Sequence, residues 1–553
     1  MVALSVVVAT YNRAPMVRRC LEALNHQTQP ADDYEVIVVD DGSTDATAHT
    51  LARFRPSFKL TVIHQANTGQ GAALNRGVAS ATGRYCLFTD DDIVAGPALI
   101  ASHLRAQTTE EGIVGIGQIG LQLPRRTDGY TRSFADWWER HYAELESGSR
   151  APTYMDCYTG NLSVPRDAFR KVGGFAVDLA RSHDVELGYR LVKLGLAVKY
   201  LGDARAIQIY RKNGSAIARD TERAGIASVQ LYARHPPMLR QIRLGRFGEA
   251  GLWETVLRRT VLFLGVPVGP LVALGHLLGE KRSPIWYQMV DRYAYWRGVR
   301  RAVTDRDTWR RLTRGPVVLM YHAFGGEEEE PSRYVVPASR FDRQMAWLRR
   351  AGYHVLPLDD LVRYLREYRL PPARSVVITI DDGYADGRSR AWPILERYGF
   401  SATFFLVAGN VGTRNCWDLT GRLRDRPLMT WADVRDLHAR GAAFGSHTQT
   451  HADLRAATPE KIDAELARSR DAIERELGSP VHLVAYPYGK HDERTEHAAA
   501  RAGFRGACTV RSGPNDPGTR PTALHRTEVY GTDSPMAFAV AVWFGRTPRM
   551  AAR

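Results

Sequence analysis

Two aspartates and two histidines in the C-terminal half of the chain have the types and spacing of a metal site. Asp381 and Asp382 directly follow one short apolar run, and His447 and His451 follow another. Histidines at i and i+4 can point the same way from one helical turn, and one aspartate raises the number of ligands to three. Three protein ligands leave zinc a fourth position for water. The pattern therefore predicts a site for zinc or a similar divalent metal.

A second group of carboxylates lies in the N-terminal half. Asp40 and Asp41 follow one apolar run, and Asp90, Asp91 and Asp92 follow another. Neighbouring carboxylates repel each other unless a cation or hydrogen-bond donors satisfy them. Mg²⁺ or Mn²⁺ prefers oxygen ligands and can in turn hold the phosphates of a substrate. The other interpretation, a polar turn that caps the next helix, fits the first pair better than the triple aspartate.

The N-terminal carboxylates follow predicted strands that alternate with predicted helices. The strands are 4–9, 34–39, 60–64 and 84–89, and the helices are 15–25, 44–54 and 71–81. This βαβ series predicts a mostly parallel sheet, which binds ligands at the carboxyl ends of its strands. The first turn reads Ala-Thr-Tyr-Asn-Arg and lacks the glycines of a dinucleotide site, so NAD binding is excluded.

A second series begins after Pro316. Its predicted strands are 317–321, 375–380, 402–407, 442–446, 482–485 and 506–510, and its clearest helix is 461–477, behind Thr458 and Pro459. Catalytic groups at the carboxyl ends of such strands are typical of α/β barrels.

Composition is that of a folded protein with more than one domain. The 553 residues are 44% hydrophobic and 24% charged, which excludes disorder and a multi-span membrane protein. Five scattered cysteines without a CxxC pair argue against a disulfide framework or a thiolate zinc site and favour a reducing compartment. The chain opens directly into a strand-like run without a secretory signal, so we expect the N-terminal domain to be cytoplasmic.

The positive charge is concentrated in the middle of the chain. The net charge is +15, and residues 234–314 hold sixteen Lys or Arg against six Asp or Glu, interleaved with aromatic residues. This pattern favours an anionic membrane surface or a lipid phosphate, and no nucleic-acid motif accompanies it. The apolar run 261–278 would be about 27 Å long as a helix, short of the roughly 30 Å hydrocarbon core. We expect peripheral membrane contact; a buried helix and a membrane span are the alternatives.

The N-terminal motifs resemble family 2 glycosyltransferases of the GT-A fold. Segments 8–13, 38–45 (VVDDGSTD), 67–77 and 88–93 (FTDDDI) carry the donor-side likeness, and 159–175 and 183–195 carry that of the acceptor side. The likeness covers roughly residues 1–215. The chain has His183 where the family usually has Glu, and a later His of the family is replaced near 208–211. It also lacks the QxxRW motif of processive polymerases, so we expect transfer of one sugar or a few.

This resemblance implies roles for individual residues. Asp41 would recognise the base or ribose of the nucleotide, Asp90 and Asp92 would hold Mn²⁺ or Mg²⁺, and Asp184 would be the general base of an inverting transfer. An inverting transfer needs one base for the acceptor hydroxyl and one cation for the departing diphosphate. We expect the donor to be a nucleotide sugar linked to UDP. The remaining residues expected to bind it are Thr10, Tyr11, Asn12, Arg13, Asp40, Asn67, Arg76 and Asp91.

The C-terminal motifs are similar to the polysaccharide deacetylases of carbohydrate esterase family 4. Segments 317–322 (VVLMYH), 379–384 (TIDDGY), 446–451 (SHTQTH) and 485–489 (AYPYG) carry the likeness over about residues 316–530.

The family likeness implies a complete hydrolytic site. Asp382, His447 and His451 would bind the metal, Asp381 would be the base, and the region of Tyr488 would hold the oxyanion. His525 would be the general acid, although a structural histidine fits it equally well, and His322 is either a residue of the outer shell or structural. The family often has Arg where this chain has Ala485.

Together these patterns predict an α/β protein with a GT-A domain at 1–233, a basic and aromatic connector at 234–315, and a distorted (β/α) barrel at 316–553. The expected function is transfer of an N-acetylated sugar, an N-acetylhexosamine, to a glycan, glycolipid or small-molecule acceptor, followed by N-deacetylation. In one alternative the two domains act on different positions of one glycan. In another, an active glycosyltransferase carries a degenerate barrel as a glycan-binding module, which the intact aspartate and histidine set argues against.

Overall fold

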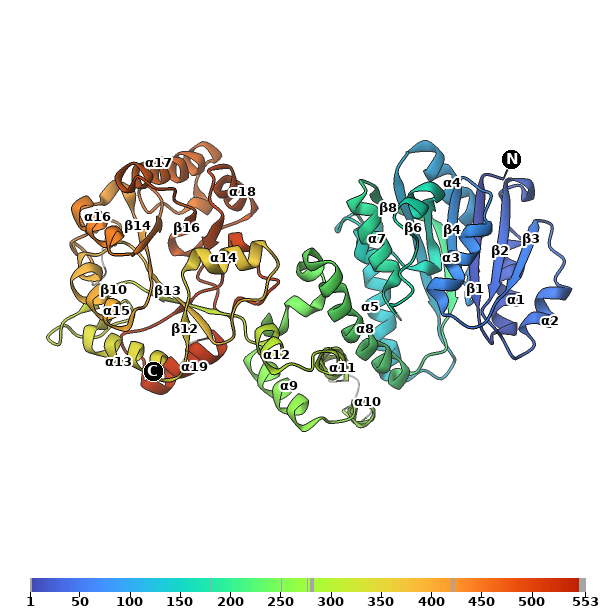
Figure 1. The fold of residues 1–553 in the computed structure, drawn as a ribbon, viewed down its shortest axis with the longest axis horizontal. Coiled ribbons are helices and arrows are strands. Elements are labelled where there is room, and N and C mark those ends of the chain that lie inside the picture. The colour runs from blue at the N-terminus through green and yellow to red at the C-terminus, as the bar shows by residue number, and fades with distance from the viewer. Residues whose placement is uncertain are drawn as a thin grey trace. The chain divides into compact units, whose positions relative to one another are not determined.

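The computed structural model describes residues 2–546 except 180, 250, 276, 279–282, 419–420 and 422. The chain forms two compact units (Figure 1). Unit 1 contains Met1–Leu231 and Val261–Ala302, and unit 2 contains Tyr232–Thr260 and Val303–Arg553. The segment predicted as a connector, 234–315, therefore belongs partly to unit 1 and partly to unit 2.

Unit 1 is built on a mixed sheet with the strand order β3-β2-β1-β4-β7-β6-β8-β5. Neighbours among β1 to β4 are parallel, whereas β7 runs antiparallel to both β4 and β6. The strands are β1 (Leu4–Thr10), β2 (Tyr34–Asp40), β3 (Lys59–His64), β4 (Tyr85–Asp90), β5 (Ile93–Ala95), β6 (Ile113–Gln122), β7 (Leu162–Pro165) and β8 (Ala197–Ile209). The predicted mostly parallel sheet is confirmed.

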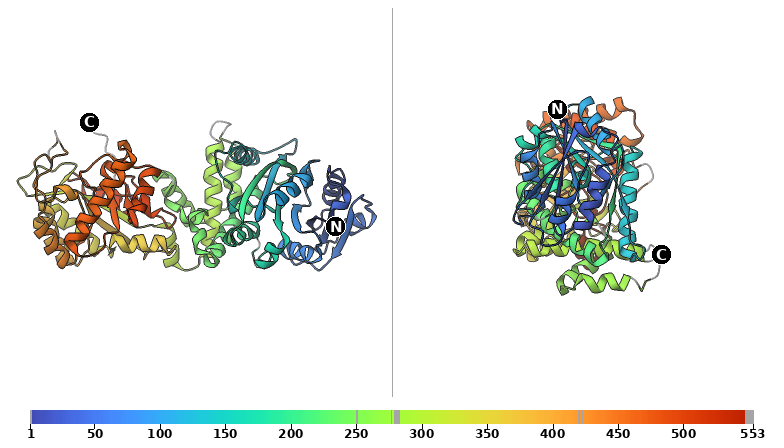
Figure 2. Two further views of the ribbon diagram at one scale, coloured as in Figure 1. Left: turned by 90° about the horizontal axis from the view of Figure 1, so that it is seen from above. Right: turned by 90° about the vertical axis from the view of Figure 1, so that its right-hand side faces the viewer.

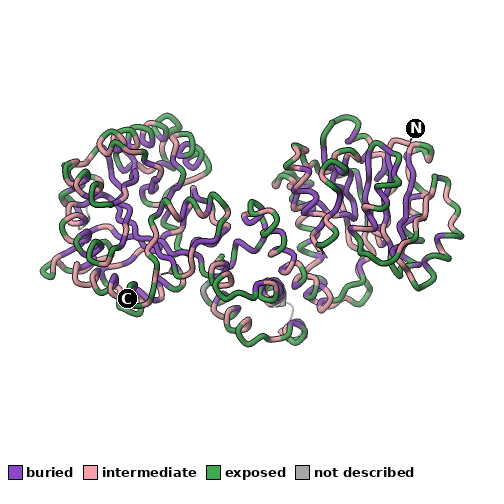
Figure 3. The backbone as a smooth tube through the Cα atoms, viewed as in Figure 1, coloured by how far each residue is buried: buried purple, intermediate pink, exposed green. Residues whose placement is uncertain are grey.

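Helices cover the faces of this sheet, so its central strands are buried (Figure 3). The helices of this part are α1 (Ala14–Leu24), α2 (Thr47–Arg53), α3 (Gln70–Ser80), α4 (Leu99–Thr109), α5 (Gly129–Glu146), α6 (Arg166–Lys171), α7 (His183–Lys193) and α8 (Gly214–Arg234). Helix α3 lies directly against β1, because a Cβ at Gly77 would be only 2.4 Å from Cγ1 of Val7. This contact fixes the helix whose first turn reaches the acidic end of the sheet.

A second apolar cluster attaches two later helices, α10 (Val268–Gly275) and α11 (Ser283–Ala302), to α5 and α8. The rings of Tyr130 and Tyr287 meet edge to face with centroids 5.1 Å apart. Helices α8 and α11 cross closely, since a Cβ at Gly225 would be 2.0 Å from the carbonyl oxygen of Tyr295. One face of α10 and one face of α11 therefore belong to the core of unit 1.

The apolar run 261–278 does not form one helix. Helix α9 (Leu252–Leu264) ends four residues into the run, and α10 begins at Val268, after Pro267. His276, within the run, lies outside the described residues. Among the residues that are described, no helix combines the length and apolar character that crossing a membrane requires.

Unit 2 is built on a curled parallel sheet with the order β17-β16-β15-β14-β13-β9-β18, and β12 pairs with β13. Its strands are β9 (Val317–Tyr321), β12 (His354–Val355), β13 (Ser375–Ile380), β14 (Thr403–Leu406), β15 (Ala443–Ser446), β16 (Leu483–Ala485), β17 (Gly506–Cys508) and β18 (Thr527–Glu528). A short parallel pair, β10 (Ala323–Gly325) and β11 (Val335–Pro337), lies beside it. A single bridge, Cys508 to Leu524, links the β17 edge to the segment before β18. The predicted distorted barrel is confirmed.

Helices surround the curled sheet on its outer side (Figures 1 and 2). They are α13 (Ala338–Arg350), α14 (Leu358–Arg366), α15 (Trp392–Tyr398), α16 (Trp431–Ala439), α17 (Pro459–Leu477), α18 (Glu493–Arg501) and α19 (Pro535–Phe544). Helix α12 (Arg306–Thr313) instead packs against the short turn Phe247–Glu249, through the rings of Trp309 and Phe247. Helix α17 begins as predicted, because the Thr458 hydroxyl accepts a hydrogen bond from the backbone N–H of Lys461 and Pro459 occupies the first turn.

Candidate active sites

The carboxyl end of β1 gathers the acidic groups of unit 1. In the sheet register Thr10 is opposite Asp40, and Ala9 is opposite Asp90. Asp40 is buried and already bonded, because it accepts from the backbone N–H of Ser43 at 3.0 Å and contacts His64 Nδ1 at 3.0 Å. Parallel strands thus bring two acidic segments to one edge, as the sequence predicts.

The three consecutive aspartates have different surroundings. Asp91 is buried and accepts from the Thr10 hydroxyl at 2.8 Å and from Arg13 Nη1 at 2.9 Å. Arg13 also reaches Asp92 Oδ2 at 3.1 Å. Burial, together with the negative charges of Asp92 and Asp91, raises the pKa of Asp90 to about 7. One Arg13 nitrogen therefore pairs with both Asp91 and Asp92, so two of the three carboxylates share a single cation.

Neutral donors complete the contacts of Asp90 and Asp92. Asp90 Oδ1 accepts from Gln70 Nε2 at 2.9 Å and from the Thr159 hydroxyl at 3.1 Å. Asp92 Oδ1 accepts from Gln208 Nε2 at 3.2 Å. The sequence reasoning did not single out these three donors as site residues, and Gln208 lies where the chain departs from its family. Asp90 and Asp92 offer carboxylate oxygens, which a hard divalent cation prefers, but the described residues of unit 1 gather no set of three metal-ligating side chains.

Asp184 joins this group from the first turn of α7. Its negative charge adds to the raised pKa of Asp90, after the larger effects of burial, Asp92 and Asp91. Its neighbour His183 is buried and packs edge-on against Phe175 at 5.4 Å between ring centroids. The histidine is thus a core residue, while the partly exposed Asp184 remains available to a substrate.

Other predicted donor-site residues shape the loops around these carboxylates. Asp41 accepts from the backbone N–H groups of Thr68 at 2.9 Å and Gly69 at 2.8 Å, so it fixes the loop before α3. Asn12, with a left-handed φ of 54°, accepts from the backbone N–H of Thr44 at 2.7 Å. Tyr11 beside it is 47% exposed. Asn12 thus fixes the loop that follows β2, and Asp41 fixes the loop that follows β3.

Two predicted donor-site residues make no described contact with the acidic group. Asn67 is exposed in the loop before α3, and Arg76 is exposed on α3 itself, six residues beyond Gln70. Nothing in the described contacts brings either side chain to Asp90 or Asp92.

In unit 2 the structure brings together Asp382, His447 and His451. One ligand atom from each lies within 4.8 Å of the others, and all three side chains are buried. Asp382 Oδ1 is 3.5 Å from His447 Nε2 and 3.4 Å from His451 Nε2. The three side chains follow the ends of β13 and β15, as the sequence predicts, but His447 and His451 lie in a loop and not on the expected helical turn, because Thr448 and His451 have left-handed φ values.

The donor chemistry of this cluster fits a divalent metal. His447 Nδ1 donates to the carbonyl oxygen of Ala485 at 2.8 Å, which directs the lone pair of Nε2 toward Asp382. Burial lowers the pKa of His447 to about 4, so this imidazole is neutral near pH 7. Among the described residues, Asp382 Oδ1 is buried without a hydrogen-bond partner. A neutral imidazole and an unsatisfied carboxylate oxygen are what a metal ligand set requires.

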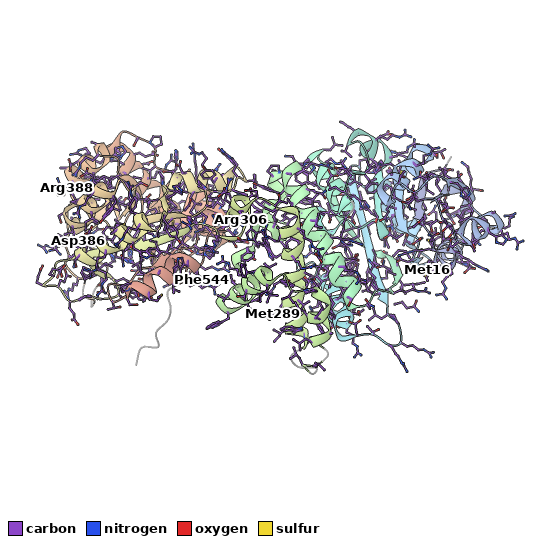
Figure 4. The ribbon with its side chains drawn as sticks, turned by 60° about the horizontal axis from the view of Figure 1, so that its bottom comes forward. Met16, Met289, Arg306, Asp386, Arg388 and Phe544 are labelled. Carbon is purple, nitrogen blue, oxygen red and sulfur yellow. The ribbon has the colours of Figure 1, made fainter. Side chains whose placement is uncertain are left out.

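The backbone around the cluster is held in unusual conformations. Asp382, His451 and Tyr488 have left-handed φ values of 71°, 61° and 59°. The ring of Tyr488 meets that of His451 edge-on at 4.7 Å between centroids and is 51% exposed. Downstream of Asp382, Asp386 (labelled in Figure 4) accepts from Arg426 Nε at 2.6 Å. Tyr488 therefore packs directly against His451, and Arg426 holds the segment that follows Asp382.

Asp381 has a buried arginine partner that the sequence reasoning missed. Arg526 Nη1 donates to Asp381 Oδ1 at 2.7 Å, and both residues are at most 2% exposed. Burial alone would raise the pKa of Asp381, but the charge of Arg526 holds it below its usual value. The chain has Ala485 where the resembled family often has arginine, and here a guanidinium reaches the aspartate from position 526.

The two further histidines lie in different places. His525 precedes Arg526 but its Nδ1 faces the carbonyl oxygen of Pro514 at 3.1 Å, and it lines a pocket with Asp516. The described contacts do not bring His525 to the metal cluster. His322, at the end of β9, lies near enough for its charge to lower the pKa of Asp381 and Asp382.

Comparisons with known proteins agree with this division. The model of glycosyl transferase family 2 matches residues 5–173, and that of polysaccharide deacetylase matches residues 369–507. YxkH of Bacillus subtilis (strain 168), named as a polysaccharide deacetylase, is 28% identical over 225 residues, which are 41% of this chain and 75% of that protein.

Validoxylamine A glucosyltransferase of Streptomyces hygroscopicus subsp. jinggangensis is 28% identical over 271 residues. The match covers 43% of this chain and 62% of the length of that relative. Among solved structures, the Streptococcus pyogenes deacetylase PplD has a TM-score of 0.36 and 24% identity, over 41% of this chain and 98% of its own. The N-terminal part of the chain thus matches glycosyl transferase family 2, and its C-terminal part matches the polysaccharide deacetylase family.

Proposed function

We propose that this chain transfers an N-acetylhexosamine from a UDP-linked donor and removes the acetyl group from the same sugar. The observation that carries the second activity is the buried cluster of Asp382, His447 and His451 beside the arginine-bound Asp381. The acidic end of the unit 1 sheet supports the first activity. One sugar then serves as product of the transferase and substrate of the deacetylase.

For the transferase, Asp184 would accept the proton of the acceptor hydroxyl as that oxygen attacks the anomeric carbon. The bond from this carbon to the nucleoside diphosphate breaks on the opposite face, so the configuration inverts. Asp90 and Asp92 would hold Mn²⁺ or Mg²⁺, which when bound neutralises charge on the departing diphosphate. The loops fixed by Asp41 and Asn12 would hold the nucleotide beside them.

For the deacetylase, Asp382, His447 and His451 would hold zinc or a similar ion, which lowers the pKa of a bound water. Asp381 would take the proton of the attacking water as the new C–O bond forms. The Tyr488 segment would donate to the oxygen that becomes negative. When the C–N bond breaks, Asp381 can return the proton to the departing nitrogen, which leaves a free amine and acetic acid, and the acid then releases its proton to give acetate.

The acceptor in this proposal is a glycan, a glycolipid or a small molecule, and both reactions take place in the cytoplasm, at the inner face of the cell membrane. The alternative of a degenerate barrel that only binds glycans is less well supported, because the metal donors and Asp381 are all present and buried. Relatives of each domain bear names of a sugar transferase and a deacetylase, which supports two activities.

A panel of nucleotide sugars incubated with the purified full chain tests this proposal. We expect release of nucleoside diphosphate with one N-acetylated donor, and acetate release that depends on prior transfer. In the His447→Ala variant acetate release should disappear while nucleoside diphosphate release persists. Nucleoside diphosphate release without any acetate from the wild-type chain, with zinc or other divalent ions supplied, would favour the binding-module alternative.

A further inference from the structure

Helix α9 exposes large apolar side chains along one side. Phe263 is 90% exposed, Trp253 84%, Leu264 66% and Leu257 44%. Positions 253, 257 and 264 fall on one stripe of a helix with 3.6 residues per turn, and Phe263 borders that stripe. We call these four residues the apolar face of α9. An exposed group of this size on a helix of a folded protein indicates a surface that something covers.

The same helix turns its cations inward. Arg258 is 5% exposed, donates to the carbonyl oxygen of Phe247 and lies with its guanidinium 4.4 Å from the centre of that ring. Arg259 donates to the carbonyl oxygen of Thr313 at 2.8 Å. A helix that faces water on its outer side normally has the reverse arrangement. The anchoring of the two arginines holds the apolar face outward and prevents rotation of the helix to hide it.

The following helices repeat this pattern. Leu277, just after α10, is 82% exposed, and Ile285, in the first turn of α11, is 64% exposed. Both helices are fixed to unit 1, because Trp286 Nε1 donates to the carbonyl oxygen of Leu271 at 2.7 Å and Tyr287 is buried. The exposed side chains thus stand on an anchored framework.

We propose that the apolar face of α9 inserts into the interfacial region of an anionic lipid bilayer and attaches the enzyme to it. Charge selects this occupant over a second copy of the chain. Residues 234–314 hold sixteen Lys or Arg against six Asp or Glu, an excess that remains positive without the inward-turned Arg258 and Arg259, and the chain carries +15. Anionic headgroups attract such a segment, whereas two copies of it repel each other. Tryptophan, phenylalanine and leucine are also the residues that enter membrane interfaces.

The attachment stands independently of the two proposed reactions, so binding can be measured without substrates. We expect the full chain to float with vesicles of phosphatidylcholine and phosphatidylglycerol at low salt, and weakly or not at all with phosphatidylcholine alone. The double variant F263S/L264S should lower the partition coefficient by about a hundredfold or more, since each buried apolar side chain contributes on the order of tenfold. The control V177S/M536S removes two similarly exposed apolar side chains elsewhere and should bind as wild type.

Two readouts separate the outcomes. Brominated lipids should quench Trp253 emission, measured as the difference between wild type and W253F. Activity on a water-soluble acceptor should be unchanged in F263S/L264S, because the apolar face is not part of either active site. Flotation of F263S/L264S equal to that of wild type would overturn the proposal. Dimers of the wild-type chain that F263S/L264S dissociates, without vesicle binding, would assign the face to self-association instead.

Discussion

The buried pair of Asp381 and Arg526 offers the sharpest test of how the deacetylase site is held. Replacement of Arg526 by methionine keeps the volume of the stem and removes the charge. Asp381 is 2% exposed and would lose a donor at 2.7 Å. Removing one partner of a buried ion pair costs about 3 to 5 kcal/mol, because the other charge stays buried without compensation. We expect the free energy of unfolding to fall by up to that amount. Protonation of Asp381 would remove its uncompensated charge and so reduce the loss.

Acetate release should fall with it, because an aspartate that becomes protonated cannot accept the proton of water. The double variant R526M/D381N removes both charges and should regain most of the lost stability without regaining activity. R526K keeps the charge but loses the hydrogen bond from Nε to the carbonyl oxygen of Thr509, and should lie between wild type and R526M. Sugar transfer should be unaffected in all three.

The measurement is urea unfolding of the full chain, followed by tryptophan fluorescence, with acetate release assayed separately without urea. The reasoning would be refuted if R526M were as stable and active as wild type. It would equally fail if D381N and R526M were additive in the double variant, since two groups in contact must couple.

Three further predictions concern the other parts of the chain. His451→Ala, like His447→Ala, should no longer retain metal or release acetate, while sugar transfer persists. Metal analysis and product assays check this. Equal loss of both activities in a folded variant would contradict two separate sites. Asp92→Ala should stop transfer and weaken nucleotide binding in the presence of Mn²⁺, whereas Asp184→Ala should stop transfer with nucleotide affinity within about threefold of wild type by titration. Glu35 is buried, which alone would raise its pKa, but hydrogen bonds from Lys59, Thr82 and Ser5 outweigh burial and lower the pKa to about 2. The ionised carboxylate should therefore contribute up to about 3 kcal/mol to the free energy of unfolding above about pH 4.5. This contribution should be lost as the pH falls toward 2. E35Q should flatten this acid dependence in unfolding curves, and an unchanged dependence would show that Glu35 is not its source.

The sequence pattern predicted the strands that are apolar on both faces. The limits 317–321 and 375–380 coincide with β9 and β13, because Pro316 precedes the first and the charged Asp381 follows the second. Parallel pairing then brings the following polar residues to one edge, which is why the metal cluster was predictable from strand ends alone.

Other features have no local signal. Arg526 and Asp381 are 145 positions apart, and nothing in the pattern around Arg526 shows that its side chain enters the barrel while that of His525 does not. The split of the run 261–278 between α9 and α10 depends on Pro267 and on packing against Tyr293, whose hydroxyl donates to the carbonyl oxygen of Val266. Hydrophobic periodicity reports only local structure, so it does not predict long-range packing of this kind.

The chain course of unit 1 bears on how the protein is made. Its core requires Tyr287 and Tyr295 against α5 and α8, yet the residues between 231 and 261 belong to unit 2. On a ribosome that adds about 5 to 20 residues per second, residues 232–302 take roughly 4 to 14 seconds to synthesise. During that interval the surfaces of α5 and α8 that will receive α11 stay uncovered on the nascent chain. A pause or a chaperone that acts in this window would therefore govern the yield of the first domain before any of the barrel strands exist.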